Sequence, residues 1–300
     1  MHPKQLGLTA DDFIENSDES LDLLARAVST VVEYTLDRRF DQKLAAASSG
    51  DTDAERYFYV GLEWLEFLIR YGRLSPSGRV LDIGCGNGRM AAPLSYYIKD
   101  GAYYGFDPQT DLIEYCKKTI RRPNFSFEHI DLSHPIYNRK GAIPSETFTF
   151  KYQPDFFDVV FAASIFTHID AATAKNYLSQ IATVLRPGGI ALLSFFAIPE
   201  AATRTVGQVT PRLGLGEGEY SYCFRKLENG QYIHCDLDGV PKNHYFSDPI
   251  GDPVAYETAS FSEMCAASGL QTVADLTGAW NGRPYLHGWQ DMLVLKKIVT

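Results

Sequence analysis

Asp82-Ile83-Gly84-Cys85-Gly86-Asn87-Gly88 is the stretch that decides the fold of this chain of 300 residues. It follows the β-rich run Arg79-Val80-Leu81 and precedes a run of helical character. Glycines at a strand-to-helix junction let the backbone turn tightly and approach a bound molecule closely. A dinucleotide fingerprint would need a further glycine at position 89, which is Arg89. The stretch therefore indicates a ligand-binding loop, but not one of the nicotinamide type.

Strand and helix patterns alternate from Arg79 onward. Strands are expected at RVLDIG, AYYGFD, FSFEHI, FDVVFAASI and IALLSFF, then at 270–280 and 291–297. Helices are expected to end near Ile98, Arg121 and Leu185, and another should lie near 261–267. Such alternation implies a mostly parallel sheet with helices on both faces. We expect an α/β, doubly wound, seven-stranded sheet in which the sixth strand runs parallel to the strands before it.

The chain on either side of these first strands suggests its organisation. Apolar residues recur at helical spacing in 21–36 and 58–69, before the first strand. The segment 198–256 is rich in Gly, Tyr and charged residues and interrupts the alternation. We expect an N-terminal helical region at 1–75 and the main domain at 76–300, with 198–256 as an inserted cap.

Composition and charge exclude several classes of protein. The net charge is -9 and no run of basic residues is present, which disfavours a nucleic-acid substrate. The longest apolar stretch, Ile190–Ile198, is too short to span a bilayer, and the opening MHPKQLGLTADDF is acidic where a signal peptide would be apolar. The five cysteines are scattered without a C-x-x-C pair, as expected for reduced thiols. We expect a cytoplasmic protein without a membrane partner, and a homo-oligomer is possible.

Acidic residues end the next two expected strands. Asp107 ends YYGFD, where a carboxylate can accept hydrogen bonds from both hydroxyls of an adenosine ribose. Asp131 follows FSFEHI at the same carboxyl edge of the sheet, where ligands bind in open α/β folds. The glycine loop and the acidic strand ends thus converge on one predicted nucleoside site.

With these motifs, and with FDVVFAASIFTHI and LRPGGIALLSFF as the fourth and fifth strands, the chain resembles the class I S-adenosylmethionine-dependent methyltransferases over roughly 79–196. The resemblance implies a Rossmann-like methyltransferase fold that binds S-adenosyl-L-methionine and releases S-adenosyl-L-homocysteine. It also implies that the glycine loop lies along the methionine part of the cofactor, that Asp107 holds the ribose, and that Asp131 with Leu132 flanks the adenine. Residues 186–189 would form a structural turn. The implied cofactor-binding residues are Asp82, Gly84, Cys85, Gly86, Asn87, Gly88, Arg89, Asp107, Pro108, Asp131, Leu132, Ala163 and Ser164.

A narrower resemblance concerns the acceptor. SIFTHI, AKNYLSQIATVLRPGG, the aromatic insertion and the ending 280–291 resemble methyltransferases associated with sugar and polysaccharide modification. We therefore expect a small-molecule acceptor, and O-methylation of a sugar or a glycosylated metabolite as the reaction.

His168 is the candidate catalytic residue. An alcohol nucleophile needs a proton acceptor, and an imidazole with an unperturbed pKa of about 6.5 suits that role. The alternative is that His168 packs against the helix opened by Asp170. No spacing of His, Asp or Glu indicates a metal. The candidate acceptor-binding residues are Tyr222, Tyr256, Trp280, Arg283 and His287.

Other functions compete with this interpretation. N-methylation of a small amine is the alternative within the same class. Base methyltransferases carry an Asn/Asp-Pro-Pro-aromatic motif after the fourth strand, where this chain has AASIF, and the signature of aminopropyl transfer is not evident. A non-catalytic partner subunit that keeps the fold would be expected to have lost the residues of the cofactor loop, and this chain retains them.

Overall fold

The computed structural model describes Lys43 and residues 54–135, 137–198, 213–214, 221–235, 253–280 and 288–298. The predicted helix at 21–36 lies outside these residues. Across the described part of the chain, no helix has the length and apolar character that a membrane crossing requires.

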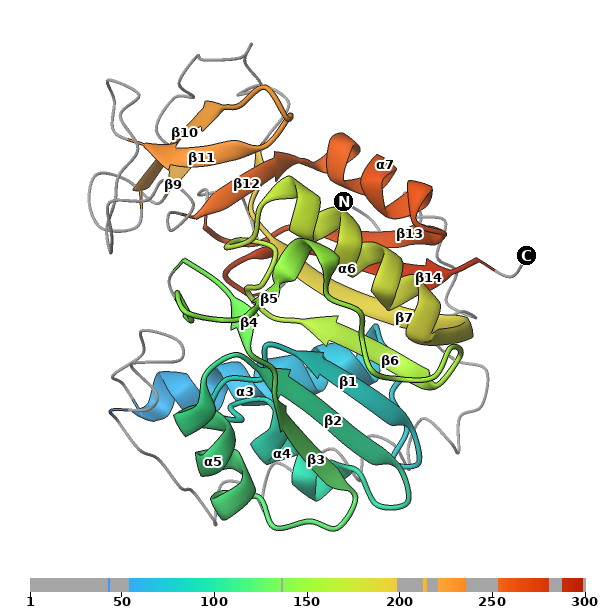
Figure 1. The fold of residues 1–300 in the computed structure, drawn as a ribbon. Coiled ribbons are helices and arrows are strands. Elements are labelled where there is room, and N and C mark those ends of the chain that lie inside the picture. The colour runs from blue at the N-terminus through green and yellow to red at the C-terminus, as the bar shows by residue number, and fades with distance from the viewer. Residues whose placement is uncertain are drawn as a thin grey trace.

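A seven-stranded sheet organises the chain, with strand order β13-β14-β7-β6-β1-β2-β3 (Figure 1). Neighbouring strands are parallel except that β14 is antiparallel to both β7 and β13. Two antiparallel pairings in succession make β13, the sixth of these strands along the chain, parallel to β7, as predicted. The strands are β1 (Arg79–Ile83), β2 (Ala102–Asp107), β3 (Phe125–His129), β6 (Phe157–Ala162), β7 (Leu185–Phe195), β13 (Leu270–Leu276) and β14 (Asp291–Lys297). The α/β, doubly wound fold is therefore confirmed.

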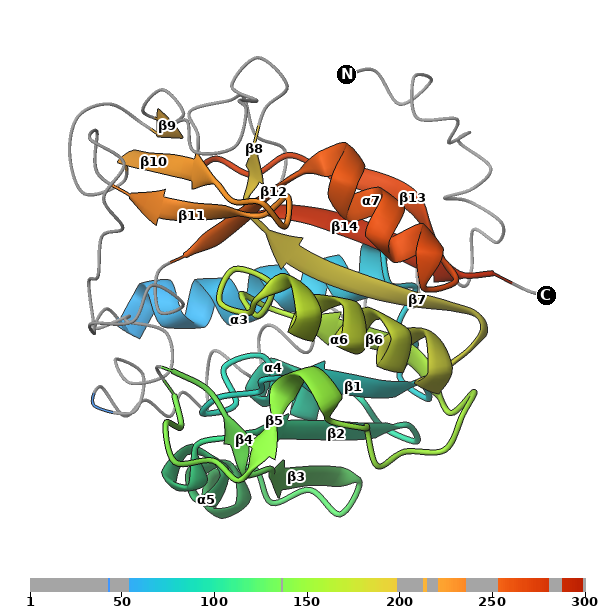
Figure 2. The same ribbon diagram turned by 45° about the horizontal axis from the view of Figure 1, so that its top comes forward.

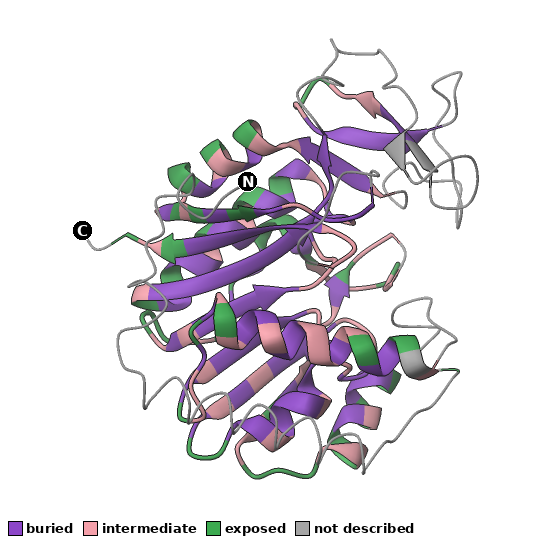
Figure 3. Ribbon diagram, turned by 180° about the vertical axis from the view of Figure 1, so that it is seen from behind, coloured by how far each residue is buried: buried purple, intermediate pink, exposed green. Residues whose placement is uncertain are grey.

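Helices cover both faces of this sheet, and each face has its own apolar core. One core joins the sheet to α3 (Ala54–Arg70), α4 (Ala91–Tyr97) and α5 (Thr110–Thr119), and the other joins it to α6 (Ala171–Val184) and α7 (Thr258–Ala267). Successive side chains of a strand point to opposite faces, so Val80 enters the first core and Leu81 the second. Burial on both faces explains why the central strands β1, β6 and β7 read as apolar runs, and Figure 3 shows these strands as mostly buried.

The second predicted N-terminal helix is α3, and it packs into the main domain. Trp64, Leu65 and Leu68 are buried in the same core as the sheet, and the Trp64 ring lies 5.6 Å from that of Phe161 on β6. Helix α3 is thus continuous with the domain expected at 76–300, and the structure gives it no core of its own in the described residues.

The predicted turn at 186–189 differs in detail. Strand β7 already pairs at Leu185 with Phe157, and the next paired residues are Ile190 and Val159. Gly188, with φ of 73°, lies in the irregular stretch between these pairs. The segment is therefore a bulge within the strand and not a turn before it.

A smaller sheet continues from the carboxyl end of β7, in the order β8-β12-β11-β10-β9 (Figure 2). Its strands are β8 (Ala197–Ile198), β9 (Leu213–Gly214), β10 (Ser221–Lys226), β11 (Tyr232–Cys235) and β12 (Val254–Glu257). They lie almost entirely within the segment expected as an inserted cap. However, Ile233, Val254 and Tyr256 belong to the core of the main sheet, so this segment also completes that core.

Buried Asp291 at the start of β14 joins the two sheets. Its carboxylate accepts hydrogen bonds from the backbone N–H of Gly278 at 3.0 Å and of Ala197 at 2.9 Å, and from the indole N–H of Trp280. The side chain therefore satisfies three donors from two segments, 278–280 and the start of β8, that meet at the carboxyl edge of the main sheet.

Asp291→Ala is expected to lower the free energy of unfolding by about 1–3 kcal/mol, because buried donors lose their acceptor. Urea denaturation followed by circular dichroism measures this change. Glu128→Ala is the matched control, since Glu128 pairs with Lys151 on the surface at 3.0 Å and such pairs contribute about 0.2–1 kcal/mol. Equal stability losses in the two variants would contradict the role assigned to Asp291.

Candidate active site

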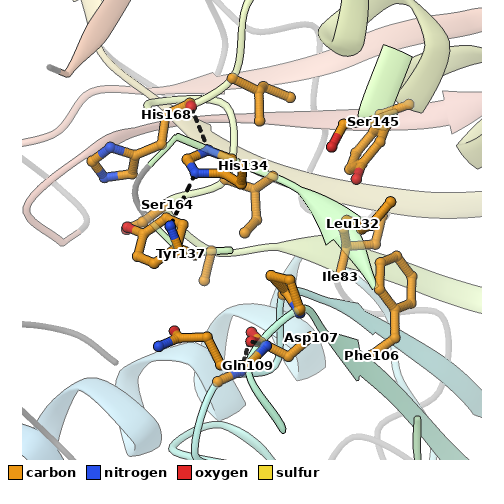
Figure 4. Close-up of a pocket in the computed structure, with 17 residues that line it drawn as sticks. Ile83, Phe106, Asp107, Gln109, Leu132, His134, Tyr137, Ser145, Ser164 and His168 are labelled. Carbon is orange, nitrogen blue, oxygen red and sulfur yellow. Dashed lines mark hydrogen bonds between the residues drawn. The ribbon is translucent and has the colours of Figure 1, made fainter. Parts of the chain in front are cut away.

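A pocket of about 730 Å³, part of it open to solvent, lies at the carboxyl edge of the main sheet (Figure 4). Its walls come from β1 and β2, from the segments that follow β1, β2, β3 and β6, and from α6. The lining residues are Ile83, Gly84, Gly86, Phe106, Asp107, Pro108, Gln109, Leu132, His134, Tyr137, Ser145, Ala163, Ser164, Ile165, His168, Ile169 and Tyr177. Of the predicted site residues, Gly84, Gly86, Asp107, Pro108, Leu132, Ala163, Ser164 and His168 meet here.

The glycine loop forms one wall of the pocket. Gly84 has a φ of 71° and Gly86 a φ of 54°, a region that side-chain-bearing residues seldom adopt. A Cβ atom on Gly84 would lie 2.2 Å from Cδ1 of Ile165 on the opposite wall. The glycines therefore bring bare backbone to the edge of the pocket, as the sequence predicted.

Asp107 lies beside this loop, at the end of β2. One carboxylate oxygen accepts the Gly86 N–H and the other accepts the Gln109 N–H, each at 2.9 Å. Burial raises the pKa of Asp107 to about 6, although these two bonds oppose the shift. Each carboxylate oxygen can accept a further hydrogen bond, so Asp107 can still receive hydroxyl donors from the pocket that it lines.

Five predicted cofactor residues of the loop do not line the pocket, namely Asp82, Cys85, Asn87, Gly88 and Arg89. Asp82 is buried behind it, accepts the Tyr103 hydroxyl at 2.6 Å and has a pKa raised to about 7 by burial. The Asn87 side chain accepts the Tyr57 hydroxyl at 2.8 Å, which joins the loop to α3. In this structure the side chains of Asp82 and Asn87 hold the loop in place.

Asp131, predicted to flank the adenine, is placed differently. Its carboxylate accepts the Asn138 side-chain N–H at 2.9 Å and the Ala142 N–H at 3.1 Å, and both bonds lower its pKa. Asp131 closes the loop between β4 (Leu132–Ser133) and β5 (Ile143–Pro144) and does not line the pocket. The adjacent Leu132 does line it. In this structure one side-chain donor and one backbone donor of the same loop engage the Asp131 carboxylate, and its contact with the adenine stays a prediction.

Ser164, at the end of β6, is the pocket residue with the most constrained backbone. Its φ is 62°, a sparsely populated value for a residue with a side chain. The Ser164 N–H donates to the Ser194 hydroxyl at 2.8 Å, and the Ser164 hydroxyl donates to the Gln290 side-chain carbonyl at 3.1 Å. These bonds from β7 and the start of β14 hold the turn that leads to His168.

His168 lines the pocket at the far side of this turn. Burial, with a smaller effect of neighbouring His134, lowers its pKa to about 4. Its Nδ1 atom is enclosed and has no hydrogen-bond partner among the described residues. The imidazole is therefore neutral near pH 7 and able to accept a proton, but its pKa lies well below the ordinary value assumed from the sequence.

Two lining residues next to His168 were not predicted from the sequence. His134 Nε2 lies 2.9 Å from the His168 carbonyl oxygen, and the Tyr137 N–H donates to His134 Nδ1 at 3.4 Å. Figure 4 shows the His134 ring between these two partners. Both residues belong to the loop at 131–142, for which no motif was recognised, and only its approach to the residues after β6 places them in the pocket.

Two of the predicted acceptor-binding residues, Trp280 and Tyr256, do not line this pocket. Trp280 is fully buried against Phe196 and Phe224, and Tyr256 is buried with its hydroxyl bonded to Gln231 at 2.8 Å. The structure gives these two side chains packing roles, because the small sheet seals them from solvent. Arg283, His287 and the side chain of Tyr222 lie outside the described part of the chain.

Comparisons with known proteins agree with this geometry. Residues 80–189 match the family model described as Methyltransferase domain, a span that contains the glycine loop, Asp107 and His168 but less than half of the chain. Over 23% of its length, the chain is 34% identical to the proposed methyltransferase 235L of Invertebrate iridescent virus 6, covering 25% of that protein. Over 41% of its length, it is 24% identical to the uncharacterized methyltransferase C1B3.06c of Schizosaccharomyces pombe, covering 41% of that protein. The chain thus matches less than half the length of each of these relatives.

A solved structure extends the likeness to most of the chain. A chain from the complex between the Haloferax volcanii Trm112 methyltransferase activator and a methyltransferase has a TM-score of 0.52 and 14% identity, covering 85% of this chain and 95% of that chain. Identity this low shows the fold alone. Residues 80–189 thus match a methyltransferase domain, and the chain around them shares the fold of a solved methyltransferase.

Proposed function

We propose that this protein transfers the methyl group of S-adenosyl-L-methionine to a hydroxyl group of a small molecule. One observation carries the proposal: a single pocket brings the glycine loop and Asp107 together with His168, a neutral imidazole. The first two are suited to a nucleoside cofactor, and the third to removing a proton from an alcohol.

The pocket fits the cofactor on its own geometry. Gly84 and Gly86 line the pocket with bare backbone, and Asp107 keeps acceptor capacity for ribose hydroxyls. Gln109 and Leu132 continue the same wall. When bound, the cofactor supplies a methyl group on a sulfonium, which is already an activated electrophile.

The task of the chain is then to align the acceptor, exclude water and take up a proton. Ser164 fixes the turn after β6 and His168 offers a neutral nitrogen near its end. Ile165 and Ile169 form apolar surface around this part of the pocket.

A sugar or glycosylated metabolite is the acceptor class that we favour. The support is the resemblance of SIFTHI and the adjoining segments to sugar-modifying methyltransferases, and the presence of Tyr137 and Tyr177 in the pocket lining. Flat ring faces beside hydrogen-bonding groups suit a polar ring-shaped ligand. A cytoplasmic location accords with the reduced thiols expected from cysteine usage.

The first test concerns the cofactor. S-Adenosyl-L-homocysteine at 100 times its Kd is expected to stabilise the protein by about 2.7 kcal/mol through linkage, whereas NAD is expected to have no such effect. Differential scanning fluorimetry with each compound measures the shift in Tm. Equal stabilisation by NAD would reject the cofactor assignment. A mass-spectrometric screen of sugars, glycosides and amines as acceptors then tests the hydroxyl class.

A further inference from the structure

The acceptor side of the pocket is formed by two segments distant in sequence. One is the loop at 131–142, which contributes His134 and Tyr137, and the other is the turn at 163–169 after β6. The loop follows β3 at the edge of the sheet, whereas the turn is held by β7 and the start of β14. Their relative position therefore depends on contacts made directly between them.

A side-chain hydrogen bond of His134 makes such a contact. Its Nε2 atom lies 2.9 Å from the carbonyl oxygen of His168, and a carbonyl can only accept. His134 Nε2 therefore carries the proton, and Nδ1 is free to accept the Tyr137 N–H at 3.4 Å. One neutral imidazole thus joins the backbone of its own loop to the backbone of the residue proposed as the base.

The rings of His134, Tyr137 and His168 pack closely around the hydrogen bond from His134 to the His168 carbonyl. The rings of His134 and Tyr137 lie 4.8 Å apart, and the Tyr137 ring meets that of His168 edge to face at 6.0 Å. His134 itself is mostly enclosed, and burial lowers its pKa, which keeps it in the neutral form that the two bonds require. The three rings form one packed unit along the pocket wall (Figure 4).

From this arrangement we infer that His134 is a positioning residue: by donating from Nε2 to the His168 carbonyl, it sets the place of the His168 imidazole in the acceptor half of the pocket. The inference rests on the proposed function for the role of His168, and on the observed 2.9 Å contact for the position of His134. Misplacement of a reacting group by about 1 Å can cost roughly 10²-fold in rate.

The test uses a pair of variants of similar size. His134→Leu removes the donor, and His134→Gln keeps an N–H near the position of Nε2. With the acceptor found in the screen, we expect kcat of His134→Leu to fall by about 10-fold to 10²-fold, and the Gln variant to recover most of it. The Kd for S-adenosyl-L-homocysteine, measured by calorimetry, is expected to stay close to that of the unchanged protein, because Asp107 and the glycine loop are untouched.

His129→Leu is the matched comparison. His129 Nε2 lies 3.1 Å from the Pro108 carbonyl oxygen, the same kind of contact but next to Asp107. Loss of this contact is expected to change the Kd for S-adenosyl-L-homocysteine. His134→Leu is instead expected to change kcat, so the two histidine variants affect different measured quantities.

A second readout needs neither cofactor nor acceptor. The ¹⁵N chemical shifts of the His168 imidazole are expected to change in His134→Leu and to return in His134→Gln. Unchanged His168 signals and kcat in a folded His134→Leu variant would overturn the inference, and so would a Gln variant as impaired as the Leu variant. Failure of the unchanged protein to bind S-adenosyl-L-homocysteine would instead reject the proposed function, and the His168 signals would still test the contact.

Discussion

His168→Ala is expected to lower turnover by about 10² to 10⁴, the range for loss of a general base. Cofactor affinity should remain nearly unchanged, since His168 lies across the pocket from Asp107 (Figure 4). Steady-state kinetics with the acceptor from the screen measures the first quantity, and calorimetry with S-adenosyl-L-homocysteine measures the second. The calorimetry also shows that the variant is folded.

The lowered pKa of His168 predicts how turnover should change with pH. Burial lowers the pKa of His168 to about 4, so the imidazole accepts a proton only above that pH. Turnover is expected to rise with pH through about 4 and then to show no further limb from His168 near 6.5, where an exposed histidine would titrate. The acidic limb should be absent in His168→Ala. Unaltered turnover in the folded variant would assign His168 to packing and favour an amine acceptor, which can reach the pocket already deprotonated.

Asp107→Ala is expected to weaken binding of S-adenosyl-L-homocysteine by about 10-fold to 150-fold, because hydrogen bonds to a charged acceptor contribute about 1.5–3 kcal/mol. Isothermal titration calorimetry at pH 7.5 measures the change. Asp131→Ala is the matched control, because its carboxylate also follows a strand at this edge but binds its own loop. Equal losses of affinity in both variants would contradict the separate roles that the structure indicates.

The same residue predicts how cofactor binding varies with pH. Asp107 has a pKa of about 6, and ribose hydroxyls donate to its ionised form. Binding should therefore strengthen as the pH rises through about 6, and this contribution should be lost in Asp107→Ala. Asp82, whose pKa is about 7, is still present in Asp107→Ala. Any pH dependence of binding that Asp82 contributes is therefore common to both proteins, and the difference between them reports Asp107. Affinity that is independent of pH between 5 and 7 in the unchanged protein would reject a role for the Asp107 carboxylate.

Local sequence was a good guide to the sheet and a partial guide to the site. Apolar runs such as that of β6 mark strands covered on both faces, and the glycines after β1 mark a turn that only glycine adopts readily. The helix before the first strand was also recognised, but its packing into the main core was not. Helical periodicity reveals an apolar face and does not say which surface that face meets.

Two buried aromatic residues show more clearly that a sequence pattern does not reveal which surface a side chain meets. Tyr256 was expected at the acceptor because aromatic rings beside polar groups suit a sugar, and Trp280 because a parallel sixth strand would end at the same edge of the sheet as the glycine loop. The structure buries both. Composition cannot distinguish a ring that faces a ligand from one that completes a core, because both need flat apolar surface.

The sequence by itself determined the order of strands and helices, the glycine loop, and the presence of Asp107 and His168 at strand ends, because each depends on residues adjacent in the chain. Only the tertiary structure decided that Asp131 binds its own loop, that His134 reaches the His168 carbonyl at 2.9 Å, and that burial takes the pKa of His168 to about 4. The Asp131 bonds stay within one loop, whereas the properties of His134 and His168 arise from residues distant in sequence. Hydrogen-bond partners and exclusion from water are set by the packing of loops from different strands, which leaves no periodic pattern in the chain.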